Sequence, residues 1–317
     1  MFQTMLTLAW LGVSCFVALE TRAEARGDFL AAESALERGD LVAFQILADG
    51  LRDDPLYPYL RFAELTRDLD QAPDARIESF LADYPETPLA ERLRLAYLRR
   101  LTDAGRWADY VRFYQPDDSV ERRCLYLRAL METGRAEEAL PEVEPIWLSG
   151  QSRPDACDPV FVHWSTAGHL TTERVWARIR LALEAGRTGL ARYLGQRLPE
   201  SERPWLALWL RVDREPERIL DASLFQETHP MRAAILAHGI AHLVRSDRER
   251  AALALRRLEP DLADDQAARE RAHVAVGRAL AESGDRLGLL YWDAVEPTAD
   301  NLPEQERRLR AAITLRA

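Results

Sequence analysis

The chain has 317 residues, of which 47% are hydrophobic and 30% charged, and this balance is typical of a folded protein with a sizeable core. Its formal net charge of −10 argues against a general phosphate-binding surface, because such surfaces need clustered positive charge. We therefore expect no nucleic-acid partner.

The N-terminus reads as a targeting segment. The run Met5–Leu19 is apolar but too short to span a bilayer comfortably, and small residues follow it at Ala23 and Ala25. We therefore predict a signal peptide over residues 1–25 and one mature domain over residues 26–317. Because no Arg or Lys precedes the apolar run, an uncleaved anchor is the alternative, and only then would the protein meet a membrane.

Removal of this segment would leave two cysteines, Cys124 and Cys157. An even number of cysteines in an exported protein indicates a disulfide. Such a bridge would close a loop of 34 residues, counting both cysteines, and would contribute about 3–4 kcal/mol. Two buried free thiols are the alternative.

Most of the chain after Gly27 has the apolar spacing of amphipathic helices. In the segment 92–101, for example, Leu93, Leu95, Ala96, Leu98 and Leu101 share one broad side at a period of 3.6 residues. Such helices recur in pairs around a short turn that contains a glycine, which fits the left-handed position after a helix end. The turn glycines are Gly39, Gly105, Gly134, Gly186 and Gly284.

Alternating β-branched runs are nearly absent, and the glycine spacing is irregular. These features predict an all-α solenoid of stacked αα-hairpins, similar to tetratricopeptide repeats but degenerate in sequence. A further junction, at residues 242–255, lacks the glycine.

Prolines mark two interruptions. Pro58 allows a helix to begin near that residue. Pro154 and Pro159 flank Asp155–Asp158 and exclude a continuous helix through the segment Trp147–Arg178. The segment Pro303–Ala317 begins as a helix after a proline and ends without a capping signal. We therefore expect the chain to be a fragment that is truncated at its C-terminus.

The histidines offer weak candidates for chemistry. His238 and His242 are four residues apart and face the same side of a helix, but Gly239 stands where a zinc protease has its glutamate, and no third ligand is evident. His163 and His169 lie near Asp155 and Asp158 without evidence of a convergent pocket. We interpret all four histidines as structural, and Trp164 and Trp176 as core residues. The spacing of residues indicates no enzyme, metal site or cofactor.

Three stretches together resemble the N-terminal part of the soluble lytic murein transglycosylases. The matching residues are Leu56–Leu60 (LYPYL), Tyr84–Ala90 (YPETPLA) and Cys157–Phe161 (CDPVF), with Trp164, the turn from Gly168 to Thr171, and Trp176. The resemblance is strongest over residues 28–200.

This resemblance implies a periplasmic α-superhelix that curls into a U and carries a C-terminal lysozyme-like domain. The family's catalytic domain cleaves the β-1,4 bond between N-acetylmuramic acid and N-acetylglucosamine of peptidoglycan to a 1,6-anhydro product without a cofactor. The resemblance also implies a disulfide between Cys124 and Cys157. The family's catalytic Glu-Ser pair is followed by Gly-Leu-Met-Gln, whereas neither Glu33-Ser34 nor Glu282-Ser283 is. No catalytic residue can therefore be assigned.

We therefore expect a non-catalytic scaffold that positions peptidoglycan glycan strands for a catalytic domain absent from this chain. The alternative is a stand-alone periplasmic helical-repeat module that binds a protein in its concave face. A third possibility is a scaffold tethered to the inner membrane by an uncleaved Met5–Leu19.

Overall fold

The computed structural model describes residues 24–294 and 304–315, so the apolar run and Cys15 of the expected signal peptide lie outside the described residues. The chain divides into two compact units, residues 1–136 and 137–317. The described residues form helices and connecting turns without a β-strand, which confirms the prediction of an all-α fold of stacked helical hairpins.

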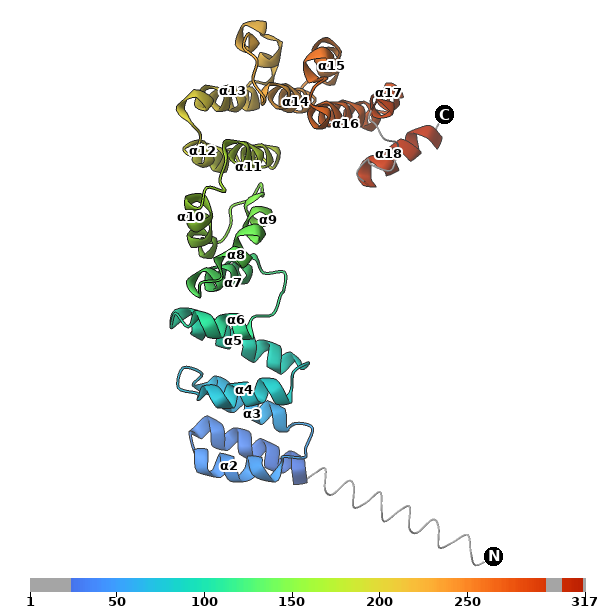
Figure 1. The fold of residues 1–317 in the computed structure, drawn as a ribbon. Helices are drawn as coiled ribbons and strands as arrows, with labels where there is room; N and C mark the ends of the chain where they lie inside the picture. Colours follow the sequence, from blue (N-terminus) through green and yellow to red (C-terminus); the bar gives the residue numbers. More distant parts are fainter. Residues whose placement is uncertain (1–23, 295–303, 316–317) are drawn as a thin grey trace, which may run out of the picture. The chain divides into compact units, whose positions relative to one another are not determined.

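The first unit is a succession of helices in which neighbours along the chain stack on one another (Figure 1). Residues 24–38 are helical. They are followed by α2 Leu41–Gly50, α3 Tyr57–Arg67, α4 Asp74–Asp83, α5 Pro88–Asp103, α6 Trp107–Phe113 and α7 Val120–Glu132. The helix α3 begins next to Pro58 as expected, with this proline in its first turn.

The second unit contains more irregular connections. Its elements are α8 Ala136–Ala139, which starts at the boundary, η1 Leu140–Glu142, α9 Val143–Trp147, η2 Asp155–Cys157, α10 Asp158–Thr166, α11 Thr172–Glu184, α12 Thr188–Gly195, η3 Glu200–Glu202, α13 Arg203–Arg214, η4 Pro216–Leu220, η5 Ala222–Phe225, α14 Arg232–Leu243, α15 Arg248–Leu262, α16 Gln266–Glu282, α17 Leu287–Asp293 and α18 Glu304–Leu315. Among the described residues, no helix combines the length and the apolar character needed to cross a membrane.

The predicted turn glycines all adopt the left-handed conformation, with φ between 66° and 81°, and Gly168 joins them. At each turn the amide of the residue after the glycine donates to a carbonyl five residues earlier, for example Arg106 N to Leu101 O at 2.8 Å. This pattern satisfies the last carbonyls of the first helix and reverses the chain. The junction without glycine uses Asp247, whose side chain accepts from Arg250 N and caps α15.

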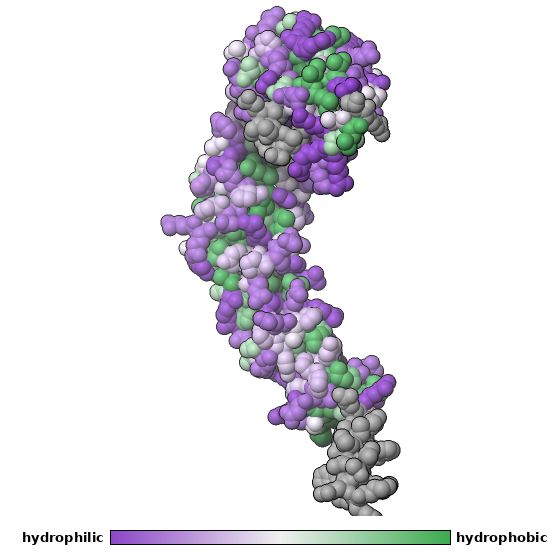
Figure 2. All heavy atoms as spheres, turned by 90° about the vertical axis from the view of Figure 1, so that its right-hand side faces the viewer, coloured by the Kyte–Doolittle hydropathy of each residue, from purple (hydrophilic) through white to green (hydrophobic). Residues whose placement is uncertain are grey.

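Each unit has its own buried clusters between successive hairpins. In α5 the buried stripe contains Leu93, Leu98 and Leu101 as predicted, but Arg94 and Tyr97 are buried where Leu95 and Ala96 are only half-buried. The stripe therefore follows the line of residues 93, 97 and 101, spaced four apart, and the prediction placed its centre slightly too far to one side. Figure 2 shows hydrophilic residues over most of the face in view, with hydrophobic residues at the surface in separate groups.

The helix α14 is deeply packed in the second unit: nine of its twelve residues are buried, and it contacts α13, α15, α16 and η4. Gly239 makes this packing possible. A β-carbon at residue 239 would lie 2.2 Å from Ile219 Cγ2 and 2.8 Å from Val212 Cγ1, which is closer than real contacts allow. The histidines on both sides of Gly239 are thereby held against α13.

Candidate functional site

Both cysteines of the expected disulfide are fully buried and disulfide-bonded in the structure. Cys124 lies in the middle of α7, and Cys157 ends the short helix η2. The bonded state agrees with an oxidising compartment, where such bridges persist. The pairing of these two cysteines with each other stays a prediction.

The segment Trp147–Arg178 contains η2, α10 and the first half of α11, and aromatic side chains pack at its centre. Trp147 packs edge-on against Phe161 at 5.1 Å between ring centroids and against Trp164 at 5.9 Å. Its indole Nε1 donates to Arg174 O at 3.3 Å. Trp164 and Trp176 are 1% and 3% exposed, which confirms that they belong to the core.

The structure does not assemble His163, His169, Asp155 and Asp158 into one site. His163 is exposed, whereas the His169 ring stacks on Trp164 with 6.2 Å between centroids. Asp155 and Asp158 are exposed at the start of η2 and α10, where acidic side chains favour a helix N-terminus. The surroundings of these four residues are those of helix ends and turns.

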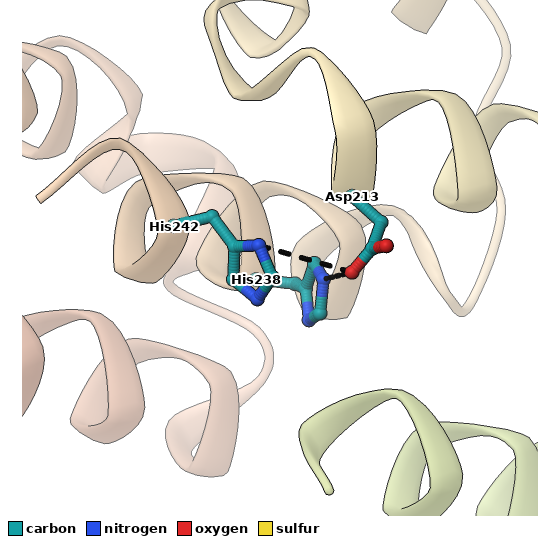
Figure 3. Close-up of side chains that lie close together, drawn as sticks. All are labelled: Asp213, His238 and His242. Carbon is teal, nitrogen blue, oxygen red and sulfur yellow. Dashed lines mark hydrogen bonds and ion pairs between the residues drawn. The ribbon is translucent and has the colours of Figure 1, made fainter. Parts of the chain in front are cut away.

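The second histidine pair forms a polar cluster with a residue that the sequence did not indicate. His238 and His242 on α14 lie side by side, with 4.1 Å between ring centroids, and Asp213 reaches them from α13 (Figure 3). His238 Nε2 is 2.9 Å from Asp213 Oδ1, within hydrogen-bond distance, and His242 Nδ1 is 3.8 Å from the same oxygen. No third group near these histidines was evident from the sequence, and the packing of α14 on α13 brings the Asp213 carboxylate to them.

Burial lowers the pKa of His238 to about 4, and the adjacent His242 acts in the same direction, while the hydrogen bond to Asp213 opposes the shift. Burial also lowers the pKa of His242. Both rings are therefore neutral at pH 7. His238 is 8% exposed, so it occupies the packing role expected for it.

The cluster could in principle hold a metal ion, since its three ligand atoms lie within 4.8 Å of one another. A four-coordinate zinc site with two neutral imidazoles and one carboxylate would leave the fourth position to water. The hydrogen bond to the half-buried Asp213 already gives the buried His238 imidazole a partner without an ion. We therefore interpret the cluster as a hydrogen-bonded connection between α13 and α14.

The sequence and the fold of this chain are both similar to those of known proteins. The chain is 28% identical over 257 residues to the soluble lytic murein transglycosylase of Escherichia coli K12, and the match covers 81% of this chain and 39% of that protein. In the solved structure of an inactive mutant of the lytic transglycosylase Slt from Pseudomonas aeruginosa, the similarity covers 91% of this chain at 31% identity, with a TM-score of 0.76. The chain is a homologue of the soluble lytic murein transglycosylases.

The homology covers only part of the relatives. The chain spans about 39% of the length of the curated relative it matches and 47% of the chain in the Pseudomonas structure. The 70 kDa soluble lytic transglycosylase of Escherichia coli has the same fold, with a TM-score of 0.63 over 93% of this chain at 24% identity. No family model matches the chain.

Neither Glu-Ser pair of this transglycosylase homologue lies in a setting suited to catalysis. Glu33 is exposed within the helical residues 24–38, and Ser34 accepts a hydrogen bond from Arg38. Glu282 is the exposed last residue of α16, and Ser283 Oγ donates to Leu280 O at 2.7 Å. Both serine hydroxyls therefore form local hydrogen bonds, Ser34 on the surface of its helix and Ser283 at the end of α16.

Proposed function

We propose that this chain is a non-catalytic scaffold of a lytic murein transglycosylase and that it positions peptidoglycan strands for the cleavage reaction. The parent enzyme would cleave the bond between N-acetylmuramic acid and N-acetylglucosamine and form 1,6-anhydro-muropeptides. In this role the chain would supply contacts with the glycan strands or their peptides, while the bond is broken elsewhere.

The observation that carries the proposal is the similarity of the fold to Pseudomonas Slt, with a TM-score of 0.76 over 91% of this chain. A framework of stacked hairpins presents a long surface of helix ends and turns, which suits an extended polymer better than a small substrate. The helical settings of Glu33 and Glu282 add support, because neither carboxylate has the enclosed surroundings of a glycosidase acid.

The same proposal places the protein outside the cytoplasm, in the bacterial periplasm. Murein lies there, and the disulfide-bonded Cys124 and Cys157 favour an oxidising compartment. Mass spectrometry of the mature N-terminus tests this part. A chain that begins near residue 26 supports export with cleavage, and a retained Met1 contradicts cleavage.

The scaffold role predicts that the purified chain binds murein. Purified sacculi are mixed with the chain at low and moderate salt and are then sedimented. We expect the chain to pellet with the sacculi and an unrelated helical protein of similar net charge to remain in solution. Recovery of the chain in the supernatant at both salt concentrations would contradict the proposal.

A further inference from the structure

A cavity of about 650 Å³ lies in the second unit between the turn after α9 and the helices α10, α11 and α12. This volume falls within the range of about 300–1,000 Å³ that is usual for small-ligand sites. One part of its lining is apolar and includes Phe161, Val162 and Leu190, whereas another part carries arginines. The cavity is separate from the cluster of Asp213, His238 and His242.

Arg178 is the unusual member of this lining. Its position on α11 is 4% exposed, and its Nε is buried without a hydrogen-bond partner. Among the described residues it has no ion pair within 4.0 Å, although its guanidinium lies 4.2 Å from the centroid of Trp147 and 5.4 Å from that of Phe161. The aromatic faces stabilise the cation only in part, because they provide no hydrogen-bond acceptor for its N–H groups.

A comparison within α11 shows what Arg178 lacks. Arg174, one turn earlier, pairs with Glu144 at 2.7 Å and donates to His169 O at 2.6 Å. Burial lowers the pKa of Arg178 to about 10, with Arg153 and Arg197 acting in the same direction, so the side chain stays charged at neutral pH. A buried cation of this kind is costly unless an anion meets it.

Two further arginines line the same cavity. Arg153 is fixed by donation from its Nε to Ile146 O at 2.7 Å, and Arg197 lies against Tyr193, whose ring centroid is 5.0 Å away. Asp155 and Asp158 also line the cavity, and Asp158 opposes the lowering of the Arg178 pKa without lying within ion-pair distance of its guanidinium. The lining therefore combines three positive and two negative side chains with an apolar wall.

We propose that this cavity binds a carboxylate-bearing peptide, with the carboxylate on Arg178 between Arg153 and Arg197 and the apolar part of the ligand against Phe161 and Leu190. Guanidinium groups bind carboxylates through two parallel hydrogen bonds. A carboxylate attached to an apolar group suits this lining better than an inorganic phosphate, because phosphate has no apolar part to cover the wall of Phe161 and Leu190. The peptide assignment rests on the proposed function, since the peptides of murein carry free carboxylates.

The test uses the full chain and calorimetric titration with N-acetyl-alanyl-alanine, the same dipeptide with an amidated C-terminus, and inorganic phosphate. We expect binding of the free acid and at least about tenfold weaker binding of the amide. Arg178→Met should reduce binding of the acid by about tenfold or more. Equal binding of acid and amide, or binding of phosphate alone, would overturn the proposal.

The matched control is Arg180→Met, which changes an arginine on the same helix that does not line the cavity and faces Glu184 at 4.0 Å. This variant should bind the dipeptide as the unaltered chain does. Arg178→Lys keeps the charge without the forked geometry and should bind with intermediate affinity. Because Arg178→Met removes an unpaired buried charge, the melting temperature of this variant should not fall. If it does fall, the affinity of Arg178→Lys for the dipeptide provides the second measurement.

Sedimentation with sacculi separates this inference from the proposed function. If the Arg178→Met variant no longer binds the dipeptide and no longer sediments with sacculi, both proposals are supported. If the dipeptide binds at Arg178 but the chain does not sediment with murein, the proposed function fails and the cavity keeps its carboxylate specificity. If Arg178→Met binds the dipeptide as the unaltered chain does, the cavity proposal fails whatever the murein result.

Discussion

His238 is a buried titratable side chain whose neutral form the fold favours. Its pKa of about 4 lies below the ordinary value of 6.5, so the unfolded chain binds more protons than the folded chain between these pH values. The contribution of His238 is therefore fully present above pH 6.5 and is lost as the pH falls toward 4. The loss amounts to about 3 kcal/mol, from 1.36 kcal/mol per pKa unit.

The prediction is that His238→Gln makes the free energy of unfolding less dependent on pH between these limits. Denaturant unfolding at a series of pH values measures the slope. The control is His163→Gln, because His163 is exposed and this variant should keep the original slope. An unchanged slope in His238→Gln would show that the lowered pKa has no consequence for stability.

At the scale of single residues, the sequence predicted which side chains lie on the same face of one helix. It did not predict which helices pack against that face. The spacing of His238 and His242 placed both on one side of a helix, and the structure agrees. Asp213 lies 25 residues before His238, and its approach depends on η4, η5 and the packing of Gly239. Arg178 was missed for a related reason. An arginine in an amphipathic pattern indicates an exposed position, and only the fold shows that Trp147 packs over this one.

At the scale of elements, the turns were the most predictable feature. A glycine after an amphipathic run fixes where a helix ends, since few other residues tolerate positive φ there. The 3₁₀ segments η4 and η5 were not predicted, because Pro216–Phe225 has no strong helical period. The position of η4 depends on contacts with α13 and α14, and η5 contacts η4, and a local sequence pattern contains neither kind of contact.

Close packing around Gly239 gives a prediction for α14. Gly239→Ala should destabilise the protein by about 1–2 kcal/mol, because overpacking against Ile219 and Val212 outweighs the better helix propensity of alanine. Thermal or urea unfolding measures the change. The matched control is Gly189→Ala in α12, where a β-carbon would meet no atom within 4 Å and stability should stay equal or rise. Equal stability of Gly239→Ala and the unaltered chain would contradict the packing argument.

The disulfide is a second prediction at this scale. We expect a peptide linked through Cys124 and Cys157 in a digest made without reductant. We also expect Cys157→Ser, or reduction, to lower the melting temperature by several degrees, because the bridge restricts the unfolded chain. Native titration of both thiols, with no change in melting temperature on adding reductant, would reject the pairing.

At the scale of the whole molecule, fold and homology are better determined than activity. The helical period and turn glycines predicted the all-α hairpins, and three short motifs predicted the homology that the comparisons confirm. Function is less accessible, because stacked helices provide a framework and chemistry depends on the groups grafted onto it. The proposed binding of murein therefore has to be tested separately from its cleavage.

Cleavage is separated from binding by the products that the chain releases from murein. Purified sacculi are incubated with the chain, and the soluble fraction is analysed by mass spectrometry for 1,6-anhydro-muropeptides, with egg-white lysozyme as a positive control for release of soluble fragments. The scaffold account predicts no 1,6-anhydro product above the level of sacculi alone. Accumulation of these products with time and with the amount of chain would contradict it.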